Sequence, residues 1–100
     1  MVLVIFRNRL RGENPPGYET VANRMVALAQ QQPGFRAIKT FTADDGERVT
    51  ISEFDSIEAV NAWRANVEHL EAQRRGRSEF YAEYLLQTCE LLREKKFSAR

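Results

Sequence analysis

The chain has 100 residues, of which 43% are hydrophobic and 29% are charged, and its formal net charge is +1. This length and balance are typical of one globular domain, expected over residues 1–100, and leave no room for a second domain. A net charge close to zero does not favour nucleic acid or an anionic membrane as a partner, and we expect neither.

The first predicted element is a strand from Val2 to about Leu10, which is apolar on both alternating sides at first. Both of its faces are therefore expected to be covered. Asn8 continues the row of Val4 and Phe6, so its carboxamide would end an otherwise apolar row. A buried amide needs a hydrogen-bond partner from the protein or from a ligand. The residues alone leave both possibilities open.

Turn residues in RGENPPGY separate this strand from a predicted helix of roughly residues 18–32. Pro33-Gly34 ends that helix. Two extended runs follow, FRAIKTFTA and RVTISEF, and Asp44-Asp45-Gly46 between them predicts a hairpin.

The stretch from Phe54 to Arg75 is predicted to form one amphipathic helix with the only Trp and the only His of the chain. Asp55 would cap its first turn and Glu58 would reach back in a capping box. One arc of the helix would lie on the sheet and consist of Val60, Trp63, Val67 and Leu70, extended by Ile57.

Trp63 stands at the edge of this arc, beside a polar strip that contains Asn66, His69 and Gln73. Such an arrangement could line a semi-polar pocket. The alternative is that Trp63 is ordinary packing and that His69 lies near solvent, and the helix pattern does not decide between them.

The last predicted strand runs from Tyr81 to about Arg93, with a helix as the weaker alternative, and a charged tail from about residue 94 is expected to be solvated. The single cysteine, Cys89, excludes an intrachain disulfide and fits a reducing compartment. The apolar start of five residues after Met1 is too short for a signal-peptide core or a membrane span. The cytoplasm is the expected location.

The element order is therefore βαββαβ, a ferredoxin-like α+β fold with a four-stranded antiparallel sheet and two helices on one face. Leu3 and Ile5 would make the other sheet face apolar. A second copy of the chain could cover that face, so a homodimer is expected.

A long segment resembles the antibiotic biosynthesis monooxygenase domain of the dimeric α+β barrel superfamily, namely PGFRAIKTFTADDGERVTISEFDSIEAVNAWRANVEHLEAQRRGRSEFYAEY. The parts that carry the resemblance are Pro33-Gly34-Phe35, the Gly46 hairpin, Glu53-Phe54-Asp55, Trp63 with His69, and Gly76-Arg77 leading to Tyr81. The resemblance covers nearly the whole chain and implies a dimeric barrel.

Two residues match the haem-degrading members of that superfamily, in which an Asn late in the first strand and a Trp on the second long helix line the pocket. These are Asn8 and Trp63. Those members bind the haem iron through a His ten residues after the Trp, where this chain has Gln73. Because a carboxamide is a poor iron ligand, the resemblance does not extend to haem degradation.

The anthrone-oxidising members use a polar pocket without metal, flavin or haem, so the resemblance implies a monooxygenase that needs no cofactor. Its substrates would be dioxygen and a small aromatic or quinol-type molecule. The implied site residues are Asn8 as a hydrogen-bond donor, Trp63 as an apolar wall, His69 as a proton acceptor and Tyr81 as a phenolic donor.

The alternative hypothesis is a dimeric small-molecule-binding or stress-associated protein of the same fold that does not catalyse a reaction. The residues that would hold a quinol would also hold a quinone. An enclosed cavity with Asn8 and Trp63 in its wall favours the enzyme, whereas a filled core favours neither hypothesis.

Overall fold

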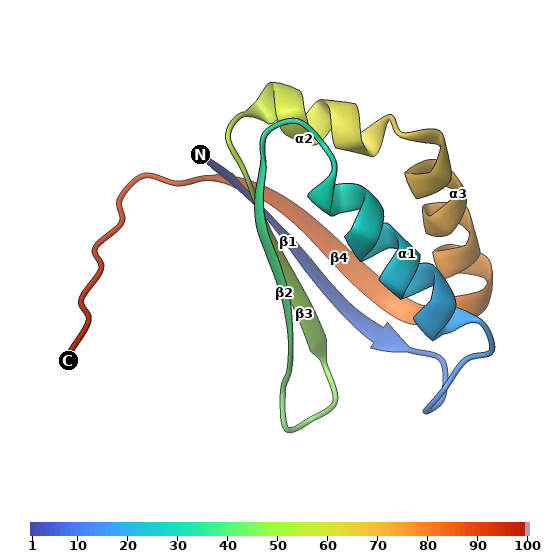
Figure 1. The fold of residues 1–100 in the computed structure, drawn as a ribbon. Helices are drawn as coiled ribbons and strands as arrows, with labels where there is room; N and C mark the ends of the chain where they lie inside the picture. Colours follow the sequence, from blue (N-terminus) through green and yellow to red (C-terminus); the bar gives the residue numbers. More distant parts are fainter. Residues whose placement is uncertain (100) are drawn as a thin grey trace.

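Four antiparallel strands form one sheet, and the helices lie on one of its faces (Figure 1). The computed structural model describes residues 1–99. The elements in chain order are β1 (Val2–Leu10), α1 (Tyr18–Gln30), β2 (Phe35–Thr42), β3 (Arg48–Phe54), α2 (Ile57–Arg64), α3 (Val67–Arg75), a short π-helical segment η1 (Gly76–Phe80) and β4 (Tyr81–Glu90). The strand order is β2-β3-β1-β4. This arrangement confirms the predicted ferredoxin-like α+β fold.

The hydrophobic core lies at one end of the layer between sheet and helices. Val2, Phe54 and Val60 are buried there, and Trp63 packs against them. These residues come from the start of β1, the end of β3 and the middle of α2. The side of β1 that begins with Val2 therefore faces the helices, and strand alternation places Asn8 on that same side.

The predicted single helix over residues 54–75 is wrong, because the chain forms two helices separated at Ala65 and Asn66. Asn66 has extended backbone angles, φ −61° and ψ 128°, and its side chain accepts a hydrogen bond of 3.1 Å from the His69 amide. Asn66 is thus an N-cap inside the predicted helix. The helix axis changes direction between α2 and α3 (Figure 1).

The helix break removes two residues from the predicted apolar arc. Val67 is 79% exposed and Leu70 is 50% exposed, and Ile57 at the start of α2 is exposed as well. A helical projection at 100° per residue predicts which side chains share a face only when the helix has one continuous axis. Of the predicted arc, Val60 is fully buried and Trp63 is half-buried.

The N-cap of α2 is Ser56, and not Asp55 as predicted. The Ser56 hydroxyl accepts a hydrogen bond of 3.2 Å from the Ala59 amide, whereas Asp55 forms an ion pair with Arg36 on β2. Phe54 is fully buried at the end of β3 and packs edge-on against Phe35.

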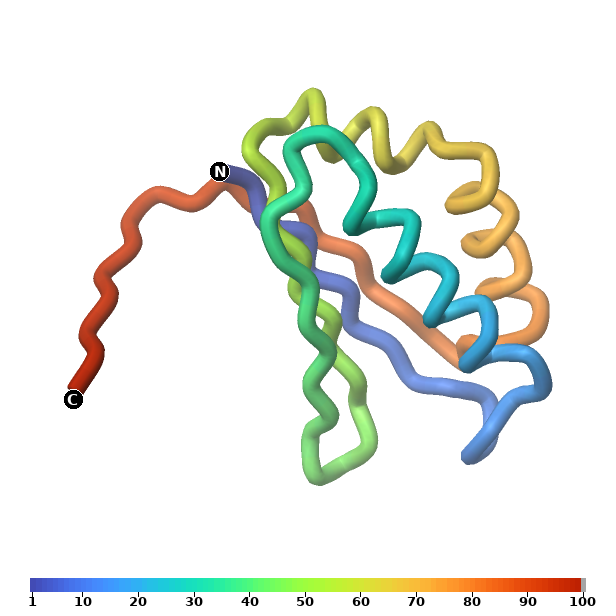
Figure 2. The backbone as a smooth tube through the Cα atoms, in the orientation of Figure 1, coloured from blue at the N-terminus to red at the C-terminus, as the bar shows by residue number. Residues whose placement is uncertain are grey.

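Two predicted boundaries are also corrected. α1 ends at Gln30 and β4, confirmed as a strand, ends at Glu90. Residues 91–99 form neither helix nor strand and extend away from the rest of the molecule (Figure 2). At 13 residues, α1 is the longest helix, and within residues 1–99 no helix has both the length and the apolar character that crossing a membrane requires.

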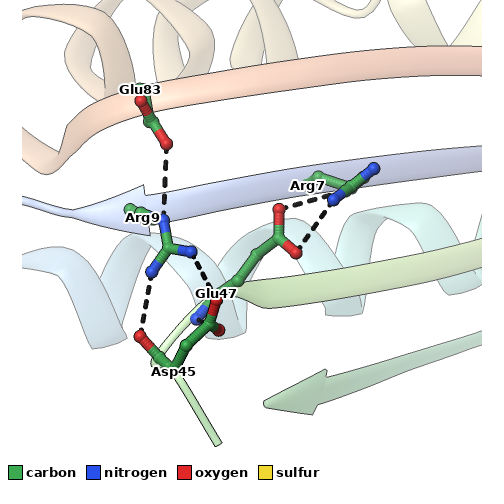
Figure 3. Close-up of polar contacts among 5 residues, drawn as sticks. All are labelled: Arg7, Arg9, Asp45, Glu47 and Glu83. Carbon is green, nitrogen blue, oxygen red and sulfur yellow. Dashed lines mark hydrogen bonds and ion pairs between the residues drawn. The ribbon is translucent and has the colours of Figure 1, made fainter. Parts of the chain in front are cut away.

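Ion pairs on the side of the sheet away from the helices connect the β2–β3 hairpin to β1 (Figure 3). Arg7 forms two hydrogen bonds of 3.0 Å with the Glu47 carboxylate. Arg9 contacts Asp45 at 2.8 Å and Glu83 on β4 at 3.4 Å. Arg9 therefore links the hairpin, β1 and β4.

Gly34 occupies the tightest position in the connection between α1 and β2. Its φ is +84°, and a Cβ atom there would lie 2.7 Å from the Cβ of Ala59 on α2. Gly46 in the hairpin has a similar φ of +91°, but no atom would lie within 4 Å of its Cβ. A glycine is therefore favoured at position 34 for two reasons: it adopts the positive φ without strain, and it leaves room for Ala59 on α2.

We expect Gly34→Ala to destabilise the fold more than Gly46→Ala. Both substitutions force a side chain into the left-handed region, at about 1–3 kcal/mol. Only Gly34→Ala adds a clash with Ala59, which contributes about 1–3 kcal/mol more. Urea unfolding of both variants measures the difference, and equal losses of unfolding free energy would show that Gly34 does not support α2.

Candidate active site

A cavity of about 300 Å³ lies between the sheet and the helices. Sheet residues Phe6, Asn8 and Arg48 line one side, and Trp63 and His69 from the helices line the other. The hydrophobic core closes one end, where Val60 is fully buried. The structure thus brings all four predicted site residues, Asn8, Trp63, His69 and Tyr81, to the wall of one cavity.

An aromatic cluster forms the opposite end of the cavity. Its members are Phe6, Tyr18, Phe80, Tyr81 and Tyr84. Neighbouring ring centroids are 5.2–6.1 Å apart, and most pairs meet edge to face. This geometry is favourable for aromatic rings and gives the cavity rigid, largely apolar walls.

Asn8 and Arg48 supply the polar wall of the cavity on the sheet. They stand directly opposite each other in the β1–β3 pair. Asn8 is only 3% exposed, and its Oδ1 has no hydrogen-bond partner. The Nε of Arg48 is likewise buried without a partner. Polar atoms left unpaired in a protein interior are uncommon, and here an acceptor and a donor lie on neighbouring strands at one cavity.

Three hydroxyl groups on this face of the sheet have partners within the protein. The hydroxyl groups of Thr40 and Thr50 are 2.7 Å apart, and the Ser52 hydroxyl lies 3.5 Å from the Val4 carbonyl oxygen. Thr50 and Ser52, which follow Arg48 on the helix-facing side of β3, thus differ from Arg48 Nε in having a partner.

Tyr81 is the first residue of β4 and contributes a neutral phenol. Burial raises its pKa well above the ordinary value; the neighbouring Tyr18 adds to this, while the charge of Arg48 acts in the opposite direction. Tyr81 therefore donates a proton in a hydrogen bond and does not act as a base near neutral pH. Gly76 makes room for the ring, because a Cβ atom there would lie 2.7 Å from it.

Trp63 and His69 are stacked across the helix break. Their ring centroids are 4.3 Å apart and their planes are inclined by 26°. The chain changes direction between the two rings, where the Asn66 side chain caps α3 at the His69 amide. Both rings are half-buried in the cavity wall, and the Nδ1 of His69 has no hydrogen-bond partner.

His69 is held in its neutral form. Burial lowers its pKa below the ordinary value; the backbone carbonyl of Arg64 opposes this shift, and the positive charge of Arg64 adds to it. A neutral imidazole keeps one nitrogen free to accept a proton. The sequence left open whether His69 lines a pocket or lies near solvent. In the structure it forms part of the cavity wall.

The charged residues of the cavity wall all carry the same sign. Within residues 1–99, the lining includes Arg48 and Arg64 but no aspartate or glutamate. Arg48 forms no ion pair in that part of the chain, and its guanidinium lies 5.2 Å from the centre of the Tyr18 ring. The site therefore favours a ligand that is negatively charged or becomes so during reaction.

Gln73 also lines the cavity, at the place where the resemblance to haem-degrading proteins requires the iron ligand. Its carboxamide is a poor ligand for iron, so the residues present do not fit that group. No cluster of three or more His, Cys, Asp or Glu side chains suited to a metal ion occurs among residues 1–99.

Arg48 and Tyr18 also line the cavity but were not predicted from the sequence as site residues. A signal for Arg48 was present, because Arg48, Thr50 and Ser52 alternate along the third strand and form a polar row on its helix-facing side. Tyr18 gave no such signal, because its spacing matches the apolar stripe of α1.

Comparison with known proteins agrees with this geometry. An uncharacterised protein from Bacillus subtilis (strain 168), YqjZ, is 39% identical over 94 residues, which cover 94% of this chain and 82% of that protein. The structure of Rv0793 from Mycobacterium tuberculosis superposes with a TM-score of 0.82 at 19% identity, covering 95% of this chain and 98% of the other.

SnoaB, a cofactor-independent oxygenase from Streptomyces nogalater, has a TM-score of 0.70 and 25% identity, and the match covers 93% of this chain and 97% of SnoaB. Residues 1–75 match the family model described as antibiotic biosynthesis monooxygenase. The match spans three quarters of the chain and includes Asn8, Arg48, Trp63 and His69. The chain therefore belongs to the antibiotic biosynthesis monooxygenase family.

Proposed function

We propose that the protein is a cofactor-independent monooxygenase that oxidises a small phenol or quinol with dioxygen. The observation that carries the proposal is the cavity itself, whose wall contains Asn8, Arg48 and His69 together with the indole ring of Trp63. Family membership and the similarity to SnoaB support it.

The reaction balances without an external reductant. The substrate loses a proton, and its delocalised anion transfers one electron to dioxygen. The resulting radical and superoxide combine to form a carbon–oxygen bond, and a proton converts the product to a hydroperoxide. Loss of the remaining hydrogen at that carbon and of hydroxide from the peroxide leaves a carbonyl group and water. One oxygen atom enters the product and the other enters water.

Asn8, Arg48 and Tyr81 stabilise the substrate anion in this mechanism. The Asn8 amide and the Tyr81 phenol can donate hydrogen bonds to an oxyanion, and Arg48 supplies a positive charge with an unused N–H group. Such donors act most strongly in a site that excludes water, because they need no reorganisation as the charge develops.

His69 and Trp63 act on the opposite wall. A neutral His69 accepts the substrate proton, and its stacking on Trp63 fixes the orientation of the imidazole. Trp63 offers an apolar face against which a flat aromatic ring can pack. The protein thus binds the ring, removes one proton and keeps water away from the radical pair.

We also propose that the active form is a homodimer joined through the sheet face that carries no helices. Strand alternation places Leu3, Ile5 and Ile51 on that face, together with Phe41 and Leu85, which are 48% and 49% exposed. An apolar area of this kind is typical of an interface between copies. The isolated domain is small, and such an interface would bury surface that it cannot cover alone.

The cytoplasm is the compartment that we propose for this protein. Cys89 is a free, exposed thiol. An exposed thiol stays reduced in the cytosol, where glutathione and thioredoxin counteract oxidation.

We expect Asn8→Ala to lower turnover of an anthrone or quinol about 10²-fold with a smaller effect on binding, because the lost donor acts on charge that develops in the transition state. Trp63→Phe should mainly weaken binding, because a smaller ring leaves part of the wall empty. Oxygen uptake, measured after chelation and without flavin or reductant, reports both effects.

Asn61→Ala is a matched control, because it removes a carboxamide from an exposed position on α2. If all three variants fold and consume oxygen at the wild-type rate, the cavity is not an active site. The protein is then better described by the alternative, a binding protein of the same fold without turnover.

The rate should fall at acidic pH as His69 becomes protonated. Burial disfavours the imidazolium, so the midpoint of this decrease should lie below the ordinary histidine value of 6.5. The pH profile of kcat/KM measures the midpoint. His69→Gln should lower the rate and remove this step, and an unchanged acidic limb in that variant would assign it to the substrate.

We expect Ile5→Asp to dissociate the dimer, because it would bury a charge without a partner at the centre of the proposed interface. Light scattering at micromolar concentration measures the mass. Thr20→Asp, on an exposed position of α1, should leave the mass unchanged. A wild-type mass equal to one chain would contradict the proposed dimer.

A further inference from the structure

We infer that α3 is a hinged cover of the cavity, and that the ion pair between Arg24 and Glu68 holds this cover closed. Neither residue lines the cavity, so the pair acts by positioning the helix that carries His69. The inference goes beyond the proposed function, because it concerns how the cavity opens and holds for an enzyme and for a binding protein alike.

The first step of the argument is the weak packing of α3. None of its nine residues is buried, whereas α1 and α2 each bury at least one side chain. The side chains of α3 that line the cavity are His69, Ala72 and Gln73. None of these three is a large apolar group, and Val67 and Leu70 of the same helix are exposed. Burial of apolar surface therefore contributes little to holding α3 in place.

The second step concerns the two ends of α3. Asn66 interrupts the helical path before it with a ψ of 128°, and the π-helical segment η1 begins at Gly76 directly after it. Val60 and Phe80, which are 0% and 2% exposed, fix the chain on either side. Between them, within residues 61–79, Gly76 is the only buried residue, and it has no side chain. Asn66 and Gly76 are therefore the joints about which α3 moves.

The third step is the contact between α3 and α1, which lie beside each other (Figure 1). Arg24 on α1 donates two hydrogen bonds of 3.0 Å to the Glu68 carboxylate. Within residues 1–99, no other ion pair joins these two helices. The two side chains are 54% and 53% exposed, so water and salt weaken the pair. A contact of this strength holds a cover closed without preventing its opening.

Opening of α3 changes the composition of the cavity wall. It separates His69 from Trp63, whose ring centroid lies 4.3 Å away, while Asn8 and Arg48 stay on the sheet. Closure therefore brings the proposed proton acceptor to a ligand that already lies against the sheet and the indole. Many enzymes complete their catalytic site by such a closure. This consequence, unlike the movement itself, rests on the proposed function.

The stack of Trp63 on His69 reports the movement, because Trp63 is the only tryptophan of the chain. We expect fluorine NMR with saturation transfer, on protein labelled with fluorotryptophan, to show a major signal for the stacked ring and a minor signal for the open state. The minor signal should have the chemical shift that the ring shows in His69→Ala, where no imidazole covers the indole. Its population should rise with salt, because ions screen the Arg24–Glu68 pair.

Glu68→Gln should raise the population of the open state about 2- to 5-fold, which is the effect of losing one exposed ion pair, and should remove its salt dependence. Glu71→Gln is the matched control. It removes the same charge from the same helix, but the partner of Glu71 is Arg74, which belongs to α3 itself. The open population in this control should stay at the wild-type level.

An unchanged population in Glu68→Gln, or an equal rise in Glu71→Gln, would overturn the inference, and so would the absence of an open-state signal in both variants and in the wild-type protein. The measurement does not depend on turnover. An open state without oxidation of any tested quinol keeps the cover and removes the monooxygenase proposal, and oxidation without an open state does the reverse.

Discussion

The hydrogen bond between the Asn66 side chain and the His69 amide determines the shape of the site. It begins α3 as a separate helix and so allows a change of direction after α2. In one continuous helix, Val67 and Leu70 would continue the apolar face of Val60 and would lie on the sheet. The break turns these two side chains toward solvent and leaves His69 in the cavity wall.

The space between sheet and helices is therefore not filled, because apolar side chains that could pack there are turned toward solvent. Val67 and Leu70 are largely exposed, and the buried core is restricted to a small cluster around Val2, Phe54 and Val60. Unpaired buried polar atoms such as Asn8 Oδ1 and Arg48 Nε each destabilise the empty protein by about 1–3 kcal/mol.

Sequence patterns predicted the strands and the long helix α1 well, because alternation and helical spacing act locally. The position of Asn8 on the helix-facing side was predicted for the same reason, since it continues an alternating row on β1. The break at Asn66 was missed, because an Asn within a helical pattern is compatible both with a polar helix position and with an N-cap. Arg48 was missed because its importance depends on register: only the pairing with β1 places it opposite Asn8.

The charged residues that flank Asn8 affect the site through the pairing register of β1. Arg7 and Arg9 point to the face without helices, where they bind Glu47 and Asp45 in the hairpin. Because side chains alternate with a period of two, a slip of one residue would bring an arginine to the cavity side and turn Asn8 outward. The two ion pairs oppose that slip at the end of the strand where Asn8 lies. They are exposed and contribute little to stability as isolated pairs, so their main effect is on which register forms. The network on one face of β1 thus specifies the position of the carboxamide on the other.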